Sequence, residues 1–318
     1  MKRIVSVSLG SKSRDASATV EIFGQQFHLE RVGTDGDIAA ARRIISELDG
    51  QVEAIGLGGI DLYLVCGRRR WTIRDAAKLA RAAKTTPVVD GSGLKDTLER
   101  RAIRVLHEEG LLVPPSSARD PEAGPHSTKV LIVSAVDRFG MAETFAELGY
   151  DCRFGDLIFA LGLPLVLASL TWIKLAAITL LPLLTRLPFT VLYPTGSKQE
   201  SQTGRAPKHF AWADIIAGDF HYIRRNLPAE GDLLRGKTII TNTTTEADMQ
   251  LLRGLGLHRL ITTTPRLEGR SFGTNMMEAA LLALSDKPFA EIGRDDYLEM
   301  LDRMEYGPSV ELLNDPNR

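Results

Sequence analysis

The sequence has few cysteines, almost no net charge and a modest share of aromatic residues. Two cysteines in 318 residues, Cys66 and Cys152, do not describe the disulfide framework typical of small secreted domains. No secretory leader precedes the first expected strand at residues 4–9, so we expect a cytoplasmic protein. The 39 basic and 40 acidic residues nearly cancel, and the composition therefore gives no indication of nucleic-acid binding.

The length of the chain fits two α/β domains better than a single core. Strands and helices alternate through residues 1–112, which we expect to form an N-terminal substrate domain that ends in a connecting helix. Residues 113–128 are rich in Pro, Gly and Ser and are predicted to be a linker. Residues 129–318 are predicted to form a Rossmann-like nucleotide-binding domain, with a doubly wound parallel sheet and C-terminal helices.

An apolar insertion at residues 157–193 interrupts this alternation. No charged residue lies between residues 157 and 173, and a second uncharged run follows shortly afterwards. A membrane-spanning helix needs about twenty apolar residues, but Pro164 and Pro182 break the stretch. We therefore favour buried helices, a lid or a subunit interface over membrane contact, and we expect a homo-oligomer.

The most informative local pattern begins with an apolar strand at residues 129–135 and a helix entered through Gly140. If Gly140 is the third glycine of a G-x-G-x-x-G turn, Asp137 stands at the second, where a pyrophosphate would approach bare backbone. Asp137 then either points away from the phosphates or is neutralised by Arg138. Asp156 ends the next strand, where such folds place the acid that binds the ribose of NAD. The expected cofactor-binding residues are Ser134, Asp137, Arg138, Phe139, Gly140, Asp156, Thr241, Asn242 and Thr243.

A second glycine-containing turn lies at residues 88–94, with the sequence Val-Val-Asp-Gly-Ser-Gly-Leu. The strand is expected to deliver Asp90 to the carboxyl edge of its sheet, and a helix leaves from the glycines. Asp90 is a candidate catalytic acid or base. An aspartate that caps the turn is an equally good interpretation.

A third candidate site follows the buried strand that ends near Gly218. Asp219 and His221 stand at its carboxyl end, where open α/β sheets bind their ligands. A histidine can act as acid or base near neutral pH, with Asp219 orienting the ring. Alternatively, His221 simply begins a surface helix.

Polar segments at residues 241–245, 262–265 and 270–275 also follow strands or lead into a helix. Hydroxyls, an arginine and free backbone N–H groups there would suit an anionic or nucleotide ligand. The alternative is helix capping, by Thr243 or Thr244 and by Thr274. The expected substrate-binding residues are Gly58, Gly59, Ser92, Arg270, Ser271 and Asn275, although the glycines at 58 and 59 also fit a close-packing turn.

The turn at residues 90–94 resembles the Asp-Gly-x-Gly-Leu turn of the shikimate and quinate dehydrogenases. Longer strings at residues 134–143, 217–225 and 270–275 are similar to those of a bacterial quinate 5-dehydrogenase-like family, over nearly the whole chain. This resemblance implies NAD-dependent oxidation of a hydroxylated carboxylate, with Asp90 acting on the hydroxyl. The lysine turn of that family, Asn-Val-Thr-x-Pro-x-Lys, has no counterpart in the sequence.

The leading hypothesis is therefore an NAD(P)-dependent oxidoreductase with a small-molecule substrate and no metal, because Cys and His are not spaced for a metal site. The missing lysine and the acid at Asp137 motivate a non-catalytic ligand-binding or sensing protein on a dehydrogenase scaffold. A third hypothesis is that the protein is an enzyme for lipid-like substrates, which would enter through residues 157–193.

Overall fold

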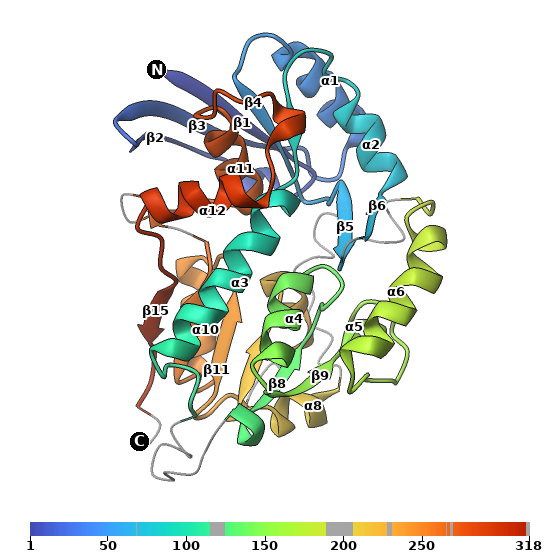
Figure 1. The fold of residues 1–318 in the computed structure, drawn as a ribbon, viewed down its shortest axis with the longest axis vertical. Helices are drawn as coiled ribbons and strands as arrows, with labels where there is room; N and C mark the ends of the chain where they lie inside the picture. The colour runs from blue at the N-terminus through green and yellow to red at the C-terminus, as the bar shows by residue number, and fades with distance from the viewer. Residues whose placement is uncertain are drawn as a thin grey trace. The chain divides into compact units, whose positions relative to one another are not determined.

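The computed structural model describes residues 1–67, 69–114, 125–188, 206–227, 231–264, 266–267 and 270–315. The chain divides into two compact units, each built on its own α/β sheet (Figure 1). Unit 1 contains residues 1–97, 178–199 and 266–306, and unit 2 contains residues 98–177, 200–265 and 307–318. The predicted boundaries differ from these, because the segment 266–306 returns to the first unit.

The sheet of unit 1 has the strand order β2-β3-β1-β4-β7. The central strand β1 (Lys2–Ser8) pairs in parallel with β3 (Gln25–Gly33) and with β4 (Ala54–Gly58). β7 (Val88–Val89) continues the parallel side, and β2 (Ala16–Ile22) forms an antiparallel edge. A separate hairpin joins β5 (Tyr63–Cys66) to β6 (Arg69–Thr72), and η1 (Lys12–Arg14) follows β1.

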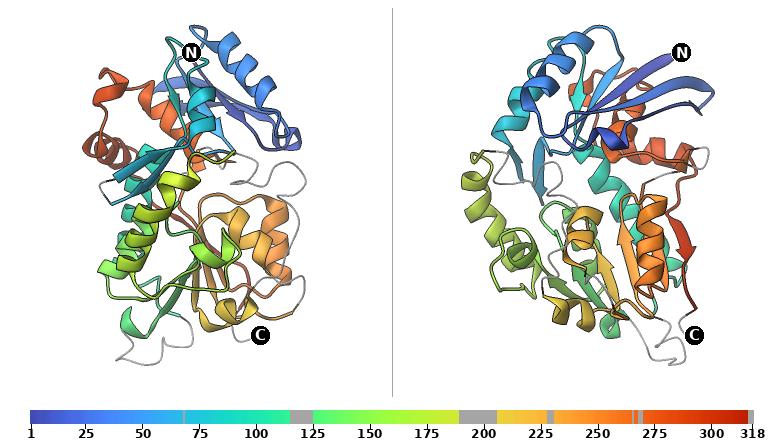
Figure 2. Two further views of the ribbon diagram at one scale, coloured as in Figure 1. Left: turned by 90° about the vertical axis from the view of Figure 1, so that its right-hand side faces the viewer. Right: turned by 180° about the vertical axis from the view of Figure 1, so that it is seen from behind.

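Helices cover both faces of this sheet, as the left view of Figure 2 shows. α1 (Ile38–Leu48) and α2 (Arg74–Ala80) pack on the face that Val5 and Val7 present. α11 (Thr274–Leu282) packs on the opposite face, against Ile4. Successive residues of a strand point to opposite faces, so the apolar run of β1 supplies both cores. Unit 1 also contains β13 (Arg266–Leu267), β14 (Arg270–Ser271), η4 (Phe289–Glu291) and α12 (Arg294–Arg303).

Glycines allow α11 to approach the strands at backbone distance. Gly91 has φ +92°, and a Cβ atom built on it would lie 2.7 Å from the backbone nitrogen of Asn275. A Cβ on Gly56 would lie 3.0 Å from the Asn275 side-chain nitrogen. The start of α11 therefore lies against Gly56 of β4 and against Gly91, which follows β7, where no side chain stands in its way.

The sheet of unit 2 has the order β15-β12-β11-β10-β8-β9. Its parallel strands are β8 (Lys129–Ile132), β9 (Asp151–Phe154), β10 (Ile215–Ala217), β11 (Thr238–Thr241) and β12 (Arg259–Thr262). β15 (Ser309–Leu312) pairs antiparallel with β12 at the edge. Numbered along the chain, the five parallel strands lie in the order 2-1-3-4-5, one of the two common orders of doubly wound sheets.

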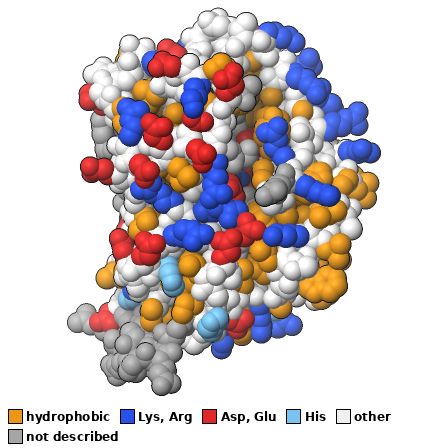
Figure 3. Space-filling view, in the orientation of Figure 1, with side chains coloured by type: hydrophobic (Ala, Val, Ile, Leu, Met, Phe, Trp, Pro, Cys, Tyr) orange, Lys and Arg blue, Asp and Glu red, His pale blue; other side chains and the backbone are white. Residues whose placement is uncertain are grey.

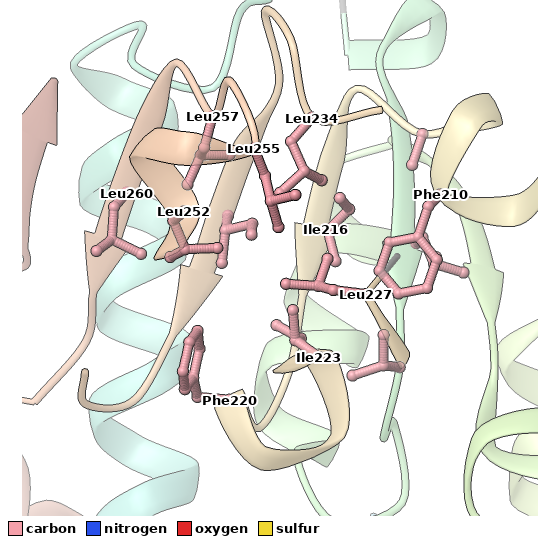
Figure 4. Close-up of a cluster of buried hydrophobic side chains, with 14 of the residues drawn as sticks. Phe210, Ile216, Phe220, Ile223, Leu227, Leu234, Leu252, Leu255, Leu257 and Leu260 are labelled. Atoms are coloured by element: carbon pink, nitrogen blue, oxygen red, sulfur yellow. The ribbon is translucent and has the colours of Figure 1, made fainter. Parts of the chain in front are cut away.

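Alternation along the strands again separates two layers of helices. Leu131, Ile216 and Leu260 belong to the core shown in Figure 4, under α8 (Pro207–Trp212), α9 (Phe220–Asn226) and α10 (Glu246–Gly254). The opposite face carries α4 (Phe139–Glu147) and, from Leu98 onward, α3 (Ser92–Glu108). η2 (Pro125–Ser127) precedes β8.

Two α/β domains with mainly parallel sheets are confirmed. The predicted Rossmann-like arrangement is wrong, because that fold orders its strands 3-2-1-4-5-6. Here the chain leaves β9 and returns to the far side of β8, so β10 lies next to β8.

The predicted apolar insertion forms α5 (Asp156–Phe159) and α6 (Leu170–Leu184), and residues 189–193 of it lie outside the described residues. None of the helices within the described ranges has the length and apolar character needed to cross a membrane.

The seating of α11 on Gly91 predicts that Gly91→Ala lowers the free energy of unfolding by roughly 2 kcal/mol or more, from backbone strain and overlap combined. The matched control is Gly24→Ala, because Gly24 has φ +76° and nothing within 4 Å of a built Cβ. It is expected to lose only about 1 kcal/mol. Urea denaturation of both variants measures the difference, and equal losses would contradict the close approach.

Candidate functional site

The topology of unit 2 marks one place for a ligand. β8 lies between β9 and β10, so the connections that leave β8 and β10 run to opposite sides of the sheet. Doubly wound sheets bind their ligands outside the carboxyl ends of the strands at such a switch point. The segment 133–138 follows β8, and Gly218 and Asp219 follow β10.

Arg138 is the central residue of this edge and is only 3% exposed. Its guanidinium pairs with the carboxylate of Glu99 on α3 and donates to Asp219 Oδ2 at 2.8 Å. Its Nε atom lies 3.5 Å from Asp137 Oδ2. Burial lowers the pKa of Arg138, but the three carboxylates outweigh burial and raise it.

Asp219 connects Arg138 to the neighbouring strand ends. Its Oδ1 atom accepts from the backbone N–H of His221 at 2.9 Å and caps α9, while Oδ2 also accepts from Asn242 Nδ2 at 3.1 Å. The backbone N–H of Asp219 donates to Ser134 Oγ at 3.3 Å. Burial raises the pKa of the Asp219 carboxyl, but the charge of Arg138 outweighs it and lowers the pKa to about 2.

The acids of this cluster meet at one cation. The guanidinium of Arg138 faces the carboxylates of Glu99, Asp137 and Asp219. The sequence left open whether Asp137 points away or is neutralised, and the structure shows it against Arg138. Because Arg138 is shared among three acids, the edge repels an anion rather than attracting it.

Asp156 explains why the glycine turn does not cradle a phosphate. Its two carboxylate oxygens accept from the backbone N–H groups of Ala135, at 3.0 Å, and Val136, at 2.8 Å. These donors belong to the turn that would hold a pyrophosphate, so an internal anion already occupies it. The prediction that Asp156 holds a ribose is therefore wrong. Burial, with a contribution from the charge of Asp137, raises the pKa of Asp156 to about 6.

The other predicted cofactor residues have local roles. Phe139 is buried at the start of α4 and lies under Lys174, whose Nζ is 5.5 Å from the ring centre. Thr241 Oγ1 donates to the carbonyl oxygen of Gly218 at 2.8 Å, and Gly140 lies within α4. Capping of α10 comes from Thr245, in a capping box with Asp248.

The expected capping residues therefore do not act as caps. α10 is not capped by Thr243 or Thr244, and Gly273 precedes α11 in the capping position expected for Thr274.

In unit 1, Asp90 holds a turn together. Its Oδ2 atom accepts from the backbone N–H groups of Leu62 and Tyr63, at 2.6 and 3.0 Å. Its Oδ1 atom accepts from the backbone N–H and the hydroxyl of Ser92, at 3.1 and 2.7 Å. These four bonds match the turn-capping alternative. On the neighbouring helix α2, Lys78 pairs with Asp75 at 2.8 Å.

The predicted substrate-binding glycines are packing sites. A Cβ on Gly58 would lie 3.0 Å from the Cβ of Ser8, and Gly59 has φ +70° and faces the backbone nitrogen of Gly10 at 3.0 Å. Asn275 donates from Nδ2 to Ser6 Oγ at 2.7 Å. The β1 and β4 ends of unit 1 are therefore filled by the protein itself. Arg270 and Ser271 form β14, and their side chains lie outside the described residues.

Sequence reasoning missed Glu99. Glu99 stands with the buried Ala102, Ile103 and Leu106 at positions i, i+3, i+4 and i+7 of α3, so the pattern placed an acid on an apolar helix face. Within the described ranges, no group of three His, Cys, Asp or Glu side chains could hold a metal ion.

Two family models match the sequence. The one described as Domain of unknown function (DUF8754) matches residues 93–313, and the one described as Domain of unknown function (DUF8753) matches residues 3–90. No curated protein matches the chain.

The chain is also distantly similar to solved structures. LsrB from Clostridium saccharobutylicum in complex with AI-2 is 13% identical with a TM-score of 0.36, over 90% of this chain and 83% of that one. A periplasmic ABC-transporter solute-binding protein from Actinobacillus succinogenes 130z with bound D-allose is 9% identical with a TM-score of 0.37, over 100% and 99%. A galactofuranose-binding protein is 8% identical with a TM-score of 0.36, over 100% and 96%.

The resemblance to quinate 5-dehydrogenases is wrong. Neither of the two family models that match the chain is described as a dehydrogenase. The carboxylate of Asp156 in the phosphate turn gives the physical reason for abandoning NAD. The expected oxidoreductase activity is wrong with it. The catalytic role of Asp90 depended on that reaction. The roles of Asp219 and His221 were inferred from their position at a strand end and stay predictions.

Because Arg138 faces three carboxylates, we expect its replacement to lower the free energy of unfolding strongly. Arg138→Met leaves buried carboxylates without their cation and should lower the free energy of unfolding by roughly 3–5 kcal/mol. Arg104→Met is the control, because the Arg104–Glu147 pair is half exposed and should contribute about 0–1 kcal/mol. Chemical denaturation measures both. Adding Glu99→Gln to Arg138→Met should recover part of the loss, and no recovery would contradict an unpaired charge as the cause.

The raised pKa of Asp156 predicts a pH dependence of stability. Between about pH 4 and pH 6 the folded protein binds this proton more tightly than the unfolded chain, so stability falls as the pH rises through that window. The contribution is roughly 1–3 kcal/mol. Asp156→Asn should therefore show a shallower fall between pH 4 and pH 7 in urea denaturation. Identical slopes for the two proteins would refute the raised pKa.

Proposed function

The chain belongs to the family described as Domain of unknown function (DUF8754), and we propose that it is a non-catalytic protein that binds a small polar molecule at the switch point of unit 2. One observation carries this proposal. The carboxyl ends of β8 and β10 hold a connected set of charged and amide groups whose orientations are fixed by one another, through Arg138, Asp219 and Asn242. Groups fixed in this way need no reordering when a ligand arrives.

The unsatisfied capacity of the cluster indicates the chemistry of the ligand. Arg138 donates to Glu99 and Asp219, and Asn242 donates to Asp219. The Nε atom of Arg138 is buried and lies 3.5 Å from Asp137 Oδ2. The side chains of Asp137 and Asp219 are 17% and 16% exposed, and an ionised carboxylate only accepts hydrogen bonds. The ligand therefore has to bring hydrogen-bond donors, as hydroxyl or ammonium groups do.

Charge excludes the opposite class of ligand. The carboxylates of Asp137 and Asp219, and a phosphate turn already filled by Asp156, disfavour phosphates, dinucleotides and carboxylates. An uncharged polyol meets these requirements, and so does a small amine. Since no reacting group or cofactor is needed for such binding, the proposal includes no chemical step.

A thermal-shift titration tests this function. Polyols, including monosaccharides, and small diamines are compared with NAD at equal concentration, since a ligand of the folded state raises the unfolding midpoint. We expect a rise with at least one donor-rich ligand and none with NAD. Asp137→Asn should weaken that response about tenfold, because a charge-assisted bond becomes a neutral one.

The matched control is Asp295→Asn, an exposed acid of α12 in unit 1 that should leave the response unchanged. A midpoint that responds to no donor-rich ligand, or only to anions, would contradict the proposed function. The expected homo-oligomer and cytoplasmic location stay predictions.

A further inference from the structure

Exposed apolar side chains are concentrated on one short part of the chain. The described residues contain thirteen exposed large hydrophobic side chains, and eight of them lie between residues 161 and 183. Surface apolar residues are usually scattered, so a concentration of this kind indicates a contact surface. We call these eight residues the apolar flank: Leu161, Leu163, Leu165, Trp172, Leu175, Ile178, Leu180 and Leu183.

The helix α6 buries one face and exposes another that is equally apolar. Ile173, Ala177 and Leu181 follow at intervals of four residues and are at most 5% exposed. Trp172 and Leu183 on the same helix are 59% and 65% exposed. The buried face already fixes the helix to the protein, so the exposed apolar face is not needed for its packing.

The loop before α6 holds its leucines outward. Leu163 donates its backbone N–H to the carbonyl oxygen of Leu157 at 2.9 Å, and Leu165 donates to that of Leu163 at 2.7 Å. Leu167 pairs with Phe154 in an isolated bridge. These backbone bonds give the loop a defined shape.

The charges beside the flank are positive. The sequence has no Asp or Glu from residue 157 to residue 199, whereas Lys174 and the exposed Arg186 lie on or directly after α6. Lys174 and Arg100 both contact the carboxylate of Glu143, at 2.9 and 2.7 Å. Figure 3 shows hydrophobic side chains gathered over α6, with lysine and arginine side chains around them.

This charge pattern decides between two occupants. In a symmetric dimer, each flank would meet its own copy and bring two copies of the exposed Arg186 together, and the segment 157–199 contains no acid to pair them. An anionic lipid surface provides the missing negative charge, and it accepts Trp and Leu side chains at the boundary between headgroups and acyl chains. We propose that the apolar flank docks the protein peripherally on an anionic lipid surface.

Vesicle co-sedimentation of the full chain tests this docking. The probes are phosphatidylcholine vesicles with about a third phosphatidylglycerol and vesicles of phosphatidylcholine alone, each at low and high salt. We expect binding to the anionic vesicles that weakens as salt is added. Trp172→Ser should lower the partition constant about tenfold or more, because a large apolar side chain is no longer buried. Arg186→Gln should weaken binding mainly at low salt.

The matched control is Phe289→Ser. Phe289 is 44% exposed and does not belong to the apolar flank, so this change removes an exposed aromatic ring elsewhere on the protein. Its binding should equal that of the unchanged protein, and unchanged unfolding midpoints show that all variants fold. Absence of vesicle binding, or binding that Trp172→Ser leaves intact, would overturn the proposal. A dimer that Trp172→Ser dissociates, without vesicle binding, would assign the flank to a second copy instead.

Discussion

The buried guanidinium of Arg138 is the interaction on which unit 2 depends. It joins the helix α3, through Glu99, to the ends of β8 and β10, through its own backbone and Asp219. Three carboxylates at one edge would repel each other and destabilise the fold without this cation. The same pairing consumes the donors that an anionic ligand would use. Stability and ligand chemistry at this edge therefore have one physical origin.

The two sheets share a topology but differ in what fills the switch point at the carboxyl end of the first parallel strand. In both, the first parallel strand lies between the second and the third, so both have a switch point at its carboxyl end. In unit 1 the gap beside β1 is closed by backbone contact at Gly59 and Gly10. In unit 2 the corresponding gap is lined by polar side chains that fix one another. The fold alone therefore does not show which of the two switch points binds a ligand. The side chains that line each switch point decide this.

Much of the architecture was predictable from local patterns, and the site only in part. Strand and helix alternation predicts both α/β domains, and position at strand ends brings Ser134, Asp137, Arg138 and Asp219 into one group. The strand order was not predictable, because apolar runs do not specify which neighbour a strand takes. Glu99 was missed because it lies 39 residues before Arg138. Asp156 was misread because its position fits a ribose acid, whereas its carboxylate turns back onto its own chain.

The return of α11 has a consequence for how the protein is made. This helix covers one face of the first sheet, yet it is encoded after residue 273, when unit 2 is nearly complete. During synthesis, the sheet face formed by Ile4, Phe27 and Leu29 stays uncovered until α11 has emerged from the ribosome. A fragment cut at the family boundary near residue 90 would expose the same bare sheet face. The sheet of unit 1 therefore cannot become fully native before residues 274–282 have been made.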